Sequence, residues 1–156
     1  MNKKQFELAQ TIGVIEEVLS SGGEFKLYPR GTSMLPFIVQ DEDSVILKRA
    51  DGPLKRHDVA FYRRANGQFV LHRVVKRGRD GRYVMCGDNQ INLERGIEDS
   101  QIIGVMSALY KKESLFDQTA FSHKLYRTFW CCITLRKIIR FPKRCVNKLL
   151  RMLKVK

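Results

Sequence analysis

The sequence predicts a mainly β domain that follows an amphipathic helix and precedes a basic, helical C-terminal tail. Between residues 24 and 112, short runs rich in β-branched and aromatic residues are typical of strands. Asn66-Gly67 and Asp80-Gly81 separate three of these runs, and both dipeptides readily adopt the positive φ angles of tight hairpins. Outside this region, apolar residues recur at helical spacing instead. We therefore expect an N-terminal helix within 1–23, a β domain over 24–112 and a basic tail over 113–156.

The N-terminal segment has the apolar spacing of one short helix. Four apolar residues recur at i, i+4, i+7 and i+11, which places them on one helical face: Leu8, Ile12, Ile15 and Leu19. Gly22-Gly23 follows, and glycine readily takes the left-handed conformation that ends a helix. A membrane-spanning helix needs about 20 predominantly apolar residues, and this segment has no such run. An amphipathic helix without a membrane span is therefore expected.

Five strands are expected in the β domain, at residues 44–47, 59–62, 69–76, 82–85 and 101–110. The two hairpin dipeptides flank the third of these strands. Successive side chains of a strand point to opposite faces, so His72 shares a face with Val70 and Val74. A histidine between two valines is either a core residue or a functional base, and the alternation alone does not distinguish these roles.

Positive charge is concentrated at the C-terminus. The 156 residues include 29 Lys and Arg against 16 Asp and Glu, which gives a formal net charge of +13. No acidic residue follows Asp117, and an apolar stripe runs among the final lysines and arginines: Val146, Leu149, Leu150 and Leu153. Such a segment either lies on an anionic membrane surface or packs on the protein with its charges solvated. Charge of this sign favours anionic partners, but no signature of specific nucleic-acid binding is present.

The cysteines and histidines predict neither a disulfide scaffold nor a metal centre. The four cysteines lack the paired spacing of a zinc site and the density of secreted disulfide-rich domains: Cys86, Cys131, Cys132 and Cys145. The three histidines are scattered, so no metal and no cofactor is expected. Reduced thiols and the lack of a transmembrane helix predict a cytoplasmic protein, peripheral to the membrane if its tail binds there.

A serine in a tight loop is the first candidate for chemistry. Ser33 lies in the run RGTSMLPF at 30–37, in which Gly31 permits close backbone approach and Pro36 restricts the residue before it. Taken alone this is an ordinary turn serine, because serine favours turns. Three further segments follow in a fixed order: DVAFY at 58–62, LHRVV at 71–75 and GDN at 87–89. Together the four segments resemble the signal-peptidase/LexA superfamily of serine peptidases, over residues 24–112.

The resemblance implies a β-rich, signal-peptidase/LexA-like fold in which Ser33 is the nucleophile and His72 is the general base. Most bacterial signal peptidases and LexA-type proteins have lysine at the base position, whereas endoplasmic-reticulum and archaeal signal peptidases have histidine. His72 corresponds to the histidine form. A serine hydroxyl is a poor nucleophile until a neighbouring base takes its proton. Imidazole, with an ordinary pKa near 6.5, suits this role without large tuning.

The third member of the site and the oxyanion hole have several candidates. Asp88 matches the aspartate that the resemblance places behind the histidine, where it orients the imidazole and stabilises its charged form. Acidic and amide residues after a glycine are also ordinary turn chemistry, and Glu94 and Asp99 are alternative carboxylates. Beside the backbone N–H of the nucleophile, the resemblance leaves Thr32 and Met34 as the oxyanion and substrate-binding residues.

The resulting expectation is a serine endopeptidase that uses a Ser33–His72 dyad, extended by Asp88, to cleave signal or leader peptides. Two alternatives stay open. One is a catalytically inactive basic protein that binds a membrane surface or nucleic acid through its charge. The other is a LexA-like regulator that cleaves itself, although the segment before Ser33 is too short for a helix-turn-helix domain and no Ala-Gly dipeptide occurs.

Overall fold

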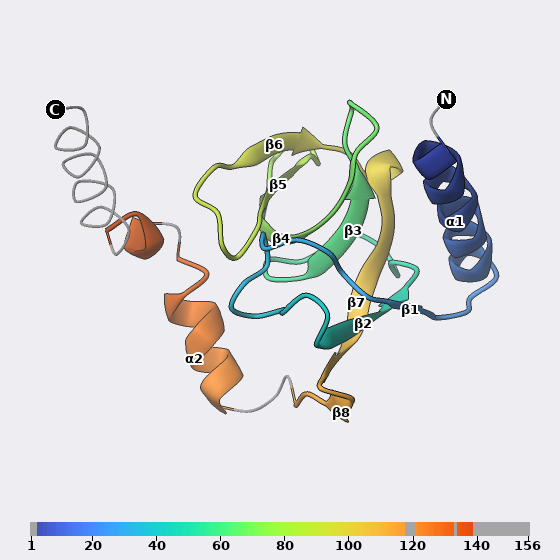
Figure 1. Ribbon diagram of the computed structural model, residues 1–156. Helices are drawn as coiled ribbons and strands as arrows, with labels where there is room; N and C mark the ends of the chain where they lie inside the picture. The colour runs from blue at the N-terminus through green and yellow to red at the C-terminus, as the bar shows by residue number, and fades with distance from the viewer. Residues whose placement is uncertain (1–2, 118–120, 133, 139–156) are drawn as a thin grey trace, which may run out of the picture. The chain divides into compact units, whose positions relative to one another are not determined.

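The computed structural model describes residues 3–117, 121–132 and 134–138 (Figure 1). The predicted apolar stripe of the tail, within 146–153, lies outside the described residues. Among those described, no helix combines the length and the apolar character that crossing a membrane requires.

The chain divides into two compact units, Met1–Phe116 and Asp117–Lys156. The first unit contains every strand found among the described residues, together with helix α1 (Lys3–Ser20). The second unit contains helix α2 (Phe121–Phe129), in the region where the sequence predicts a helical tail. All residues considered for the candidate site lie in the first unit.

One antiparallel sheet of eight strands forms the body of the first unit, so the predicted mainly β fold is confirmed. The strands are β1 (Phe25–Leu27), β2 (Asp43–Lys48), β3 (Val59–Arg63), β4 (Phe69–Arg77), β5 (Tyr83–Cys86), β6 (Glu94–Ile97), β7 (Ile102–Lys111) and β8 (Ser114–Leu115). The order across the sheet is β1-β2-β7-β3-β4-β5-β6, and β8 pairs with β7. A 3-10 helix, Asp99–Gln101, precedes β7.

Each of the five predicted strands forms, and both predicted hairpins flank β4. Gly67, between β3 and β4, has a φ of 84°, and Gly81, between β4 and β5, has a φ of 81°. These are left-handed conformations that favour glycine. The sequence does not predict β1, β6 and β8, because runs of two to four residues carry no readable alternation.

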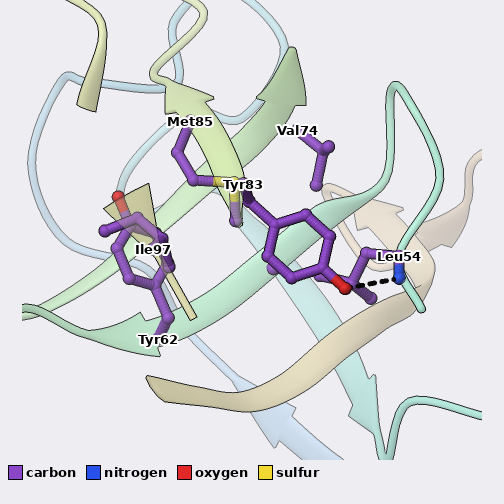
Figure 2. Packing of buried hydrophobic residues seen from close by; sticks show 7 residues of the cluster. Leu54, Tyr62, Val74, Tyr83, Met85 and Ile97 are labelled. Carbon is purple, nitrogen blue, oxygen red and sulfur yellow. Dashed lines mark hydrogen bonds between the residues drawn. The ribbon is translucent and has the colours of Figure 1, made fainter. Parts of the chain in front are cut away.

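A cluster of buried side chains holds β3, β4, β5 and β6 together (Figure 2). Its labelled members are Leu54, Tyr62, Val74, Tyr83, Met85 and Ile97. The N–H of Leu54 donates a hydrogen bond of 3.1 Å to the Tyr83 hydroxyl, so this aromatic ring is buried with its polar end satisfied. Burying a large apolar side chain stabilises a fold by about 1.5–3 kcal/mol. The cluster therefore fixes β4, the strand that carries His72, on its Val74 face.

Helix α1 contacts β7 and β1 through its apolar face. Ile12, Ile15 and Leu19 are buried, whereas Val14 on another side of the helix is exposed. A Cβ at Gly104 of β7 would lie 2.8 Å from Cδ1 of Leu19, so the absence of a side chain there admits the leucine. The helix therefore covers part of the sheet with the residues that its periodicity places on one face.

Candidate active site

Ser33 lies on the loop between β1 and β2, and short-range hydrogen bonds give this loop its shape. Gly31 has a φ of 96°, and its N–H donates to Oε1 of Gln40 at 2.6 Å. The N–H of Leu35 donates to the Thr32 carbonyl at 3.3 Å. Ser33 itself is half-buried, so its side chain sits at the boundary between the protein interior and solvent.

The turn that begins with Gly87 binds the Ser33 loop from the other side. The backbone N–H of Asn89 donates to the Ser33 carbonyl at 2.7 Å, and the Asn89 side chain donates to the Thr32 carbonyl at 3.0 Å. A Cβ at Gly87 would lie only 2.6 Å from the Ser33 carbonyl oxygen and 3.1 Å from Nε2 of His72. Glycine is therefore required here for steric reasons. The same observation places the Ser33 loop and the imidazole of His72 around one point.

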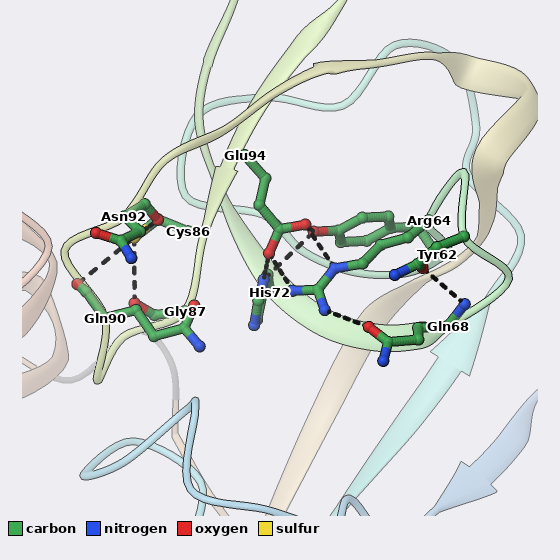
Figure 3. A network of polar contacts seen from close by, with 10 residues as sticks. Tyr62, Arg64, Gln68, His72, Cys86, Gly87, Gln90, Asn92 and Glu94 are labelled. Atoms are coloured by element: carbon green, nitrogen blue, oxygen red, sulfur yellow. Dashed lines mark hydrogen bonds and ion pairs between the residues drawn. The ribbon is translucent and has the colours of Figure 1, made fainter.

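His72 is a nearly inaccessible residue of β4, with 1% of its surface exposed. Its Nδ1 lies 3.1 Å from Oε1 of Glu94 and 3.3 Å from the Tyr62 hydroxyl (Figure 3). The other ring nitrogen points away from this cluster, toward Gly87. Burial lowers the pKa of His72 below its ordinary value, and the positive charge of Arg64 lowers it further, while Glu94 opposes both. The imidazole is therefore neutral at pH 7.

Glu94 begins β6 and accepts hydrogen bonds from several donors at once (Figure 3). Nε of Arg64 donates to Oε2 at 2.8 Å, Nη2 of Arg64 binds Oε1, and the Tyr62 hydroxyl donates to Oε2 at 2.9 Å. Burial raises the pKa of Glu94, but the hydrogen bonds from Arg64 and Tyr62 outweigh it and hold the pKa below its ordinary value. Glu94 is therefore a carboxylate at neutral pH.

The position of the proton on the His72 ring follows from the ionised state of Glu94. An ionised carboxylate only accepts hydrogen bonds, so Nδ1 of His72 must be the donor toward Glu94. A neutral imidazole carries one N–H, which leaves Nε2 as an unprotonated acceptor. This is the tautomer that a general base needs, with its free lone pair directed to the side where the Ser33 loop lies.

Asp88, the third member that the resemblance implies, forms an ion pair with Arg73. Its carboxylate accepts hydrogen bonds from Arg73, from Nε at 2.8 Å and from Nη2 at 2.6 Å, and both residues are buried. The remaining Arg73 nitrogen donates to the His57 carbonyl at 2.9 Å, and the guanidinium lies 4.6 Å from the ring centre of Phe37. This pair joins β4 to the turn that holds the Ser33 loop. The carboxylate placed at Nδ1 of His72 is that of Glu94.

The remaining residues predicted for the site are Asp99, Thr32 and Met34, and each has different surroundings. Asp99, an alternative third member, accepts a hydrogen bond from the Tyr83 hydroxyl and forms an ion pair with Arg77 at 3.4 Å. Thr32 is exposed, and its carbonyl is engaged by the loop and by Asn89. Met34 is buried and lines the cavity next to Ser33.

Two residues that bind Glu94 beside His72, namely Tyr62 and Arg64, are not predicted from the sequence. Ala60 pairs directly with His72 in the sheet, so Tyr62 is a diagonal neighbour of the histidine on the same face. Cross-strand neighbours of this kind are close enough for aromatic side chains to interact. The alternation within 59–62 indicates which side chains share a face with Tyr62. It identifies Tyr62 as a neighbour of His72 only when the β3–β4 register is known.

A cavity of about 330 Å³ lies beside Ser33. Its lining is mostly apolar and comes from α1, the end of β1, the Ser33 loop, β3 and β4. The lining includes Ile15, Met34, Ile38, Phe61 and Leu71. Leu71 is the chain neighbour of His72, so the cavity and the imidazole are positioned by the same strand.

Within the described part of the chain, no group of three or more histidine, cysteine or carboxylate side chains gathers as metal ligands would. No protein-family model matches the chain, and no curated protein matches it either.

Proposed function

We propose that this chain is a serine endopeptidase in which Ser33 is the nucleophile and His72 the general base, acting on leader or signal segments of peptides. The observation that supports it most strongly is the meeting of the Ser33 loop and Nε2 of His72 at Gly87. A neutral, desolvated imidazole with its lone pair directed toward Gly87, where the Ser33 loop passes, is compatible with the arrangement that nucleophilic serine catalysis requires.

Each half of the reaction, acylation and deacylation, has two proton transfers at Nε2 of His72. As Oγ of Ser33 bonds to the carbonyl carbon, its proton moves to Nε2, and the carbonyl oxygen gains negative charge. The protonated imidazole then gives this proton to the leaving amine as the C–N bond breaks. A water molecule then attacks the acyl carbon and gives a proton to Nε2. This proton passes to Oγ of Ser33 as the ester bond breaks and the acyl group leaves. The backbone N–H of Ser33 is our candidate donor to the oxyanion, with Thr32 as the second.

The cavity beside Ser33 supports a peptide substrate with apolar side chains near the scissile bond. Its walls are mostly hydrophobic, and burial of apolar side chains supplies binding energy roughly in proportion to the area removed from water. Leader and signal segments have this composition. The volume of the cavity lies at the lower end of the usual range for ligand sites, which suits one or two side chains rather than a folded domain.

Ser33→Ala tests the nucleophile. With a pool of synthetic peptides that have an apolar core and small residues near its end, the substitution should lower kcat by about 10⁴- to 10⁶-fold while the thermal transition stays in place. Ser114→Ala, at an exposed serine of β8, is the matched control and should retain full activity. Cleavage by Ser33→Ala at the rate of the unmodified chain would exclude Ser33 as the nucleophile.

A covalent label tests the same site without a known substrate. A fluorophosphonate that reacts with activated serines should modify Ser33, as located by mass spectrometry of the digested protein. His72→Gln should abolish this labelling, because Oγ then lacks its base. A lack of label on the folded, unmodified chain, together with salt-dependent binding to anionic vesicles or nucleic acid, would favour the non-catalytic basic protein instead.

A further inference from the structure

We propose that Glu94 is the residue that positions His72 for catalysis, and that Tyr62 and Arg64 hold Glu94 for this purpose. The inference rests on the proposed Ser33–His72 function and adds its third member. Of the carboxylates that the sequence offers, Glu94 is the one placed at Nδ1, with its Oε1 at 3.1 Å. A hydrogen bond from Nδ1 to a carboxylate fixes both the ring orientation and the tautomer.

The four donors around Glu94 leave its carboxylate little freedom to turn. Nη2 of Arg64 and Nδ1 of His72 lie at Oε1, and Nε of Arg64 and the Tyr62 hydroxyl lie at Oε2 (Figure 3). Bidentate binding by a guanidinium is geometrically specific as well as strong. Arg64 is in turn bound by Gln68, whose Oε1 accepts from Nη1 at 3.0 Å. The β3–β4 hairpin therefore determines where the carboxylate faces the ring.

Arg64 also limits how strongly Glu94 acts on the histidine. A bare carboxylate beside Nδ1 would favour the charged imidazolium in the resting enzyme and occupy the base with a proton. Burial of the ring opposes that effect most, the nearby guanidinium compensates part of the charge, and the pKa of His72 stays below its ordinary value. The cluster thus orients the ring while it remains available as a base at neutral pH.

The loop before β6 brings Glu94 to this position. Sγ of Cys86 lies 3.4 Å from the Gly87 carbonyl, 3.5 Å from that of Gln90 and 3.3 Å from that of Asn92, so the loop closes around the thiol (Figure 3). The chain then pairs with β5, where Glu94 lies opposite Met85. Asp88 and Glu94 are therefore at opposite ends of one compact loop, and the fold directs one to Arg73 and the other to His72.

The tautomer of His72 tests the proposal on the unmodified chain. Nitrogen chemical shifts of the imidazole, measured by NMR at pH 7.5 with His72→Gln for assignment, should show a proton on Nδ1 and none on Nε2. A proton on Nε2 would overturn the proposal, because Glu94 would then have no donor at Nδ1. This measurement needs no turnover, so a chain with the expected tautomer that cleaves no peptide would refute the peptidase while supporting the role of Glu94.

Glu94→Gln tests the catalytic consequence. Two donors at Oε2 should retain the amide oxygen there, which places the amide NH₂ at Nδ1 and moves the ring proton to Nε2. We expect kcat to fall on the order of 10⁴-fold with KM nearly unchanged, as for the equivalent Asp→Asn change in the Ser-His-Asp template. The matched control is Glu98→Gln, an exposed carboxylate paired with Arg82, which should leave kcat unchanged.

The pH profile distinguishes positioning from a structural role. The charged and titratable groups that act on His72 are Glu94, Arg64 and Asp88, with the Tyr62 hydroxyl as a neutral neighbour. Glu94 raises the pKa of His72. In Glu94→Gln, the acid limb of kcat, which is the fall of kcat as His72 is protonated, should therefore move to lower pH. A merely structural residue would reduce the folded fraction without moving this limb. Unchanged kcat and an unmoved limb in folded Glu94→Gln would overturn the proposal.

Discussion

Two carboxylates lie near His72, and each is paired with an arginine, yet the two pairs differ in burial and in what else they bind. Asp88 and Arg73 are 1% and 4% exposed, and Arg73 also binds the His57 carbonyl and lies over the Phe37 ring. Glu94 and Arg64 are 22% and 28% exposed, and their carboxylate is shared with a histidine and a tyrosine. The first pair joins segments of the chain, and Asp88 acts on His72 through its charge. The carboxylate of the second pair lies directly at Nδ1 of the ring. The role of a carboxylate is thus decided by which donors reach it.

The largest expected effect comes from breaking the fully buried pair. Asp88→Asn leaves the Arg73 guanidinium buried without its counter-ion, so the free energy of unfolding should fall by about 3–5 kcal/mol. Urea unfolding followed by circular dichroism measures this. Asp51→Asn, which removes a carboxylate paired with Lys48 in solvent, should leave the transition where it is. A small loss for Asp88→Asn would show that the comparison exaggerates the structural role of this pair.

Gly87→Ala should lower both the stability of the chain and its activity. The added methyl would lie 2.6 Å from the Ser33 carbonyl oxygen, so the turn or the loop must move, at a cost of about 1–3 kcal/mol of stability. A displacement of this kind should also lower kcat/KM by about 10²-fold. Gly13→Ala, in helix α1 with no atom near the added methyl, is the control and should not destabilise. Wild-type turnover by Gly87→Ala would contradict the proposed role of the meeting between the Ser33 loop and His72 at Gly87.

The pH dependence of stability separates the contribution of His72 from that of Glu94. The pKa of His72 is lower in the folded chain than its unfolded value near 6.5, so the unfolded state binds the proton first. The stabilisation is complete above pH 6.5 and is lost as the pH falls toward the folded pKa. The pKa of Glu94 is also lowered, but its contribution is lost only below pH 4.5. His72→Gln should therefore flatten the stability curve between pH 6.5 and 5, as measured by urea unfolding at each pH.

The smallest effect on stability is expected for the partly exposed pair of Arg64 and Glu94. Arg64→Gln should change the free energy of unfolding by about 0.2–1 kcal/mol, because such pairs are screened by solvent. Its effect on chemistry should be clearer, since Arg64 lowers the pKa of His72 and its loss should move the acid limb of kcat to higher pH. This shift is opposite in sign to that of Glu94→Gln. Shifts of the same sign in both variants would mean that the two charges do not act separately on the ring.

Much of the frame of the site is readable from the sequence. The hairpin glycines, the alternation of Val70, His72 and Val74, and the loop around Ser33 depend on near neighbours in the chain, where backbone conformation and strand periodicity act directly. The strands too short for a pattern are not readable in this way, and β6 is among them. Glu94 therefore stands in the sequence as one of several carboxylates.

The sequence by itself determines a mainly β chain, with a serine in a tight loop and a histidine on a buried strand face. Only the tertiary structure decides that Glu94 faces the imidazole and that Asp88 binds Arg73. The physical reason is that each carboxylate is captured by the donors closest in space. Those donors, Arg64 and Tyr62 for one and Arg73 for the other, are brought to it by sheet register and loop closure, which no local pattern encodes.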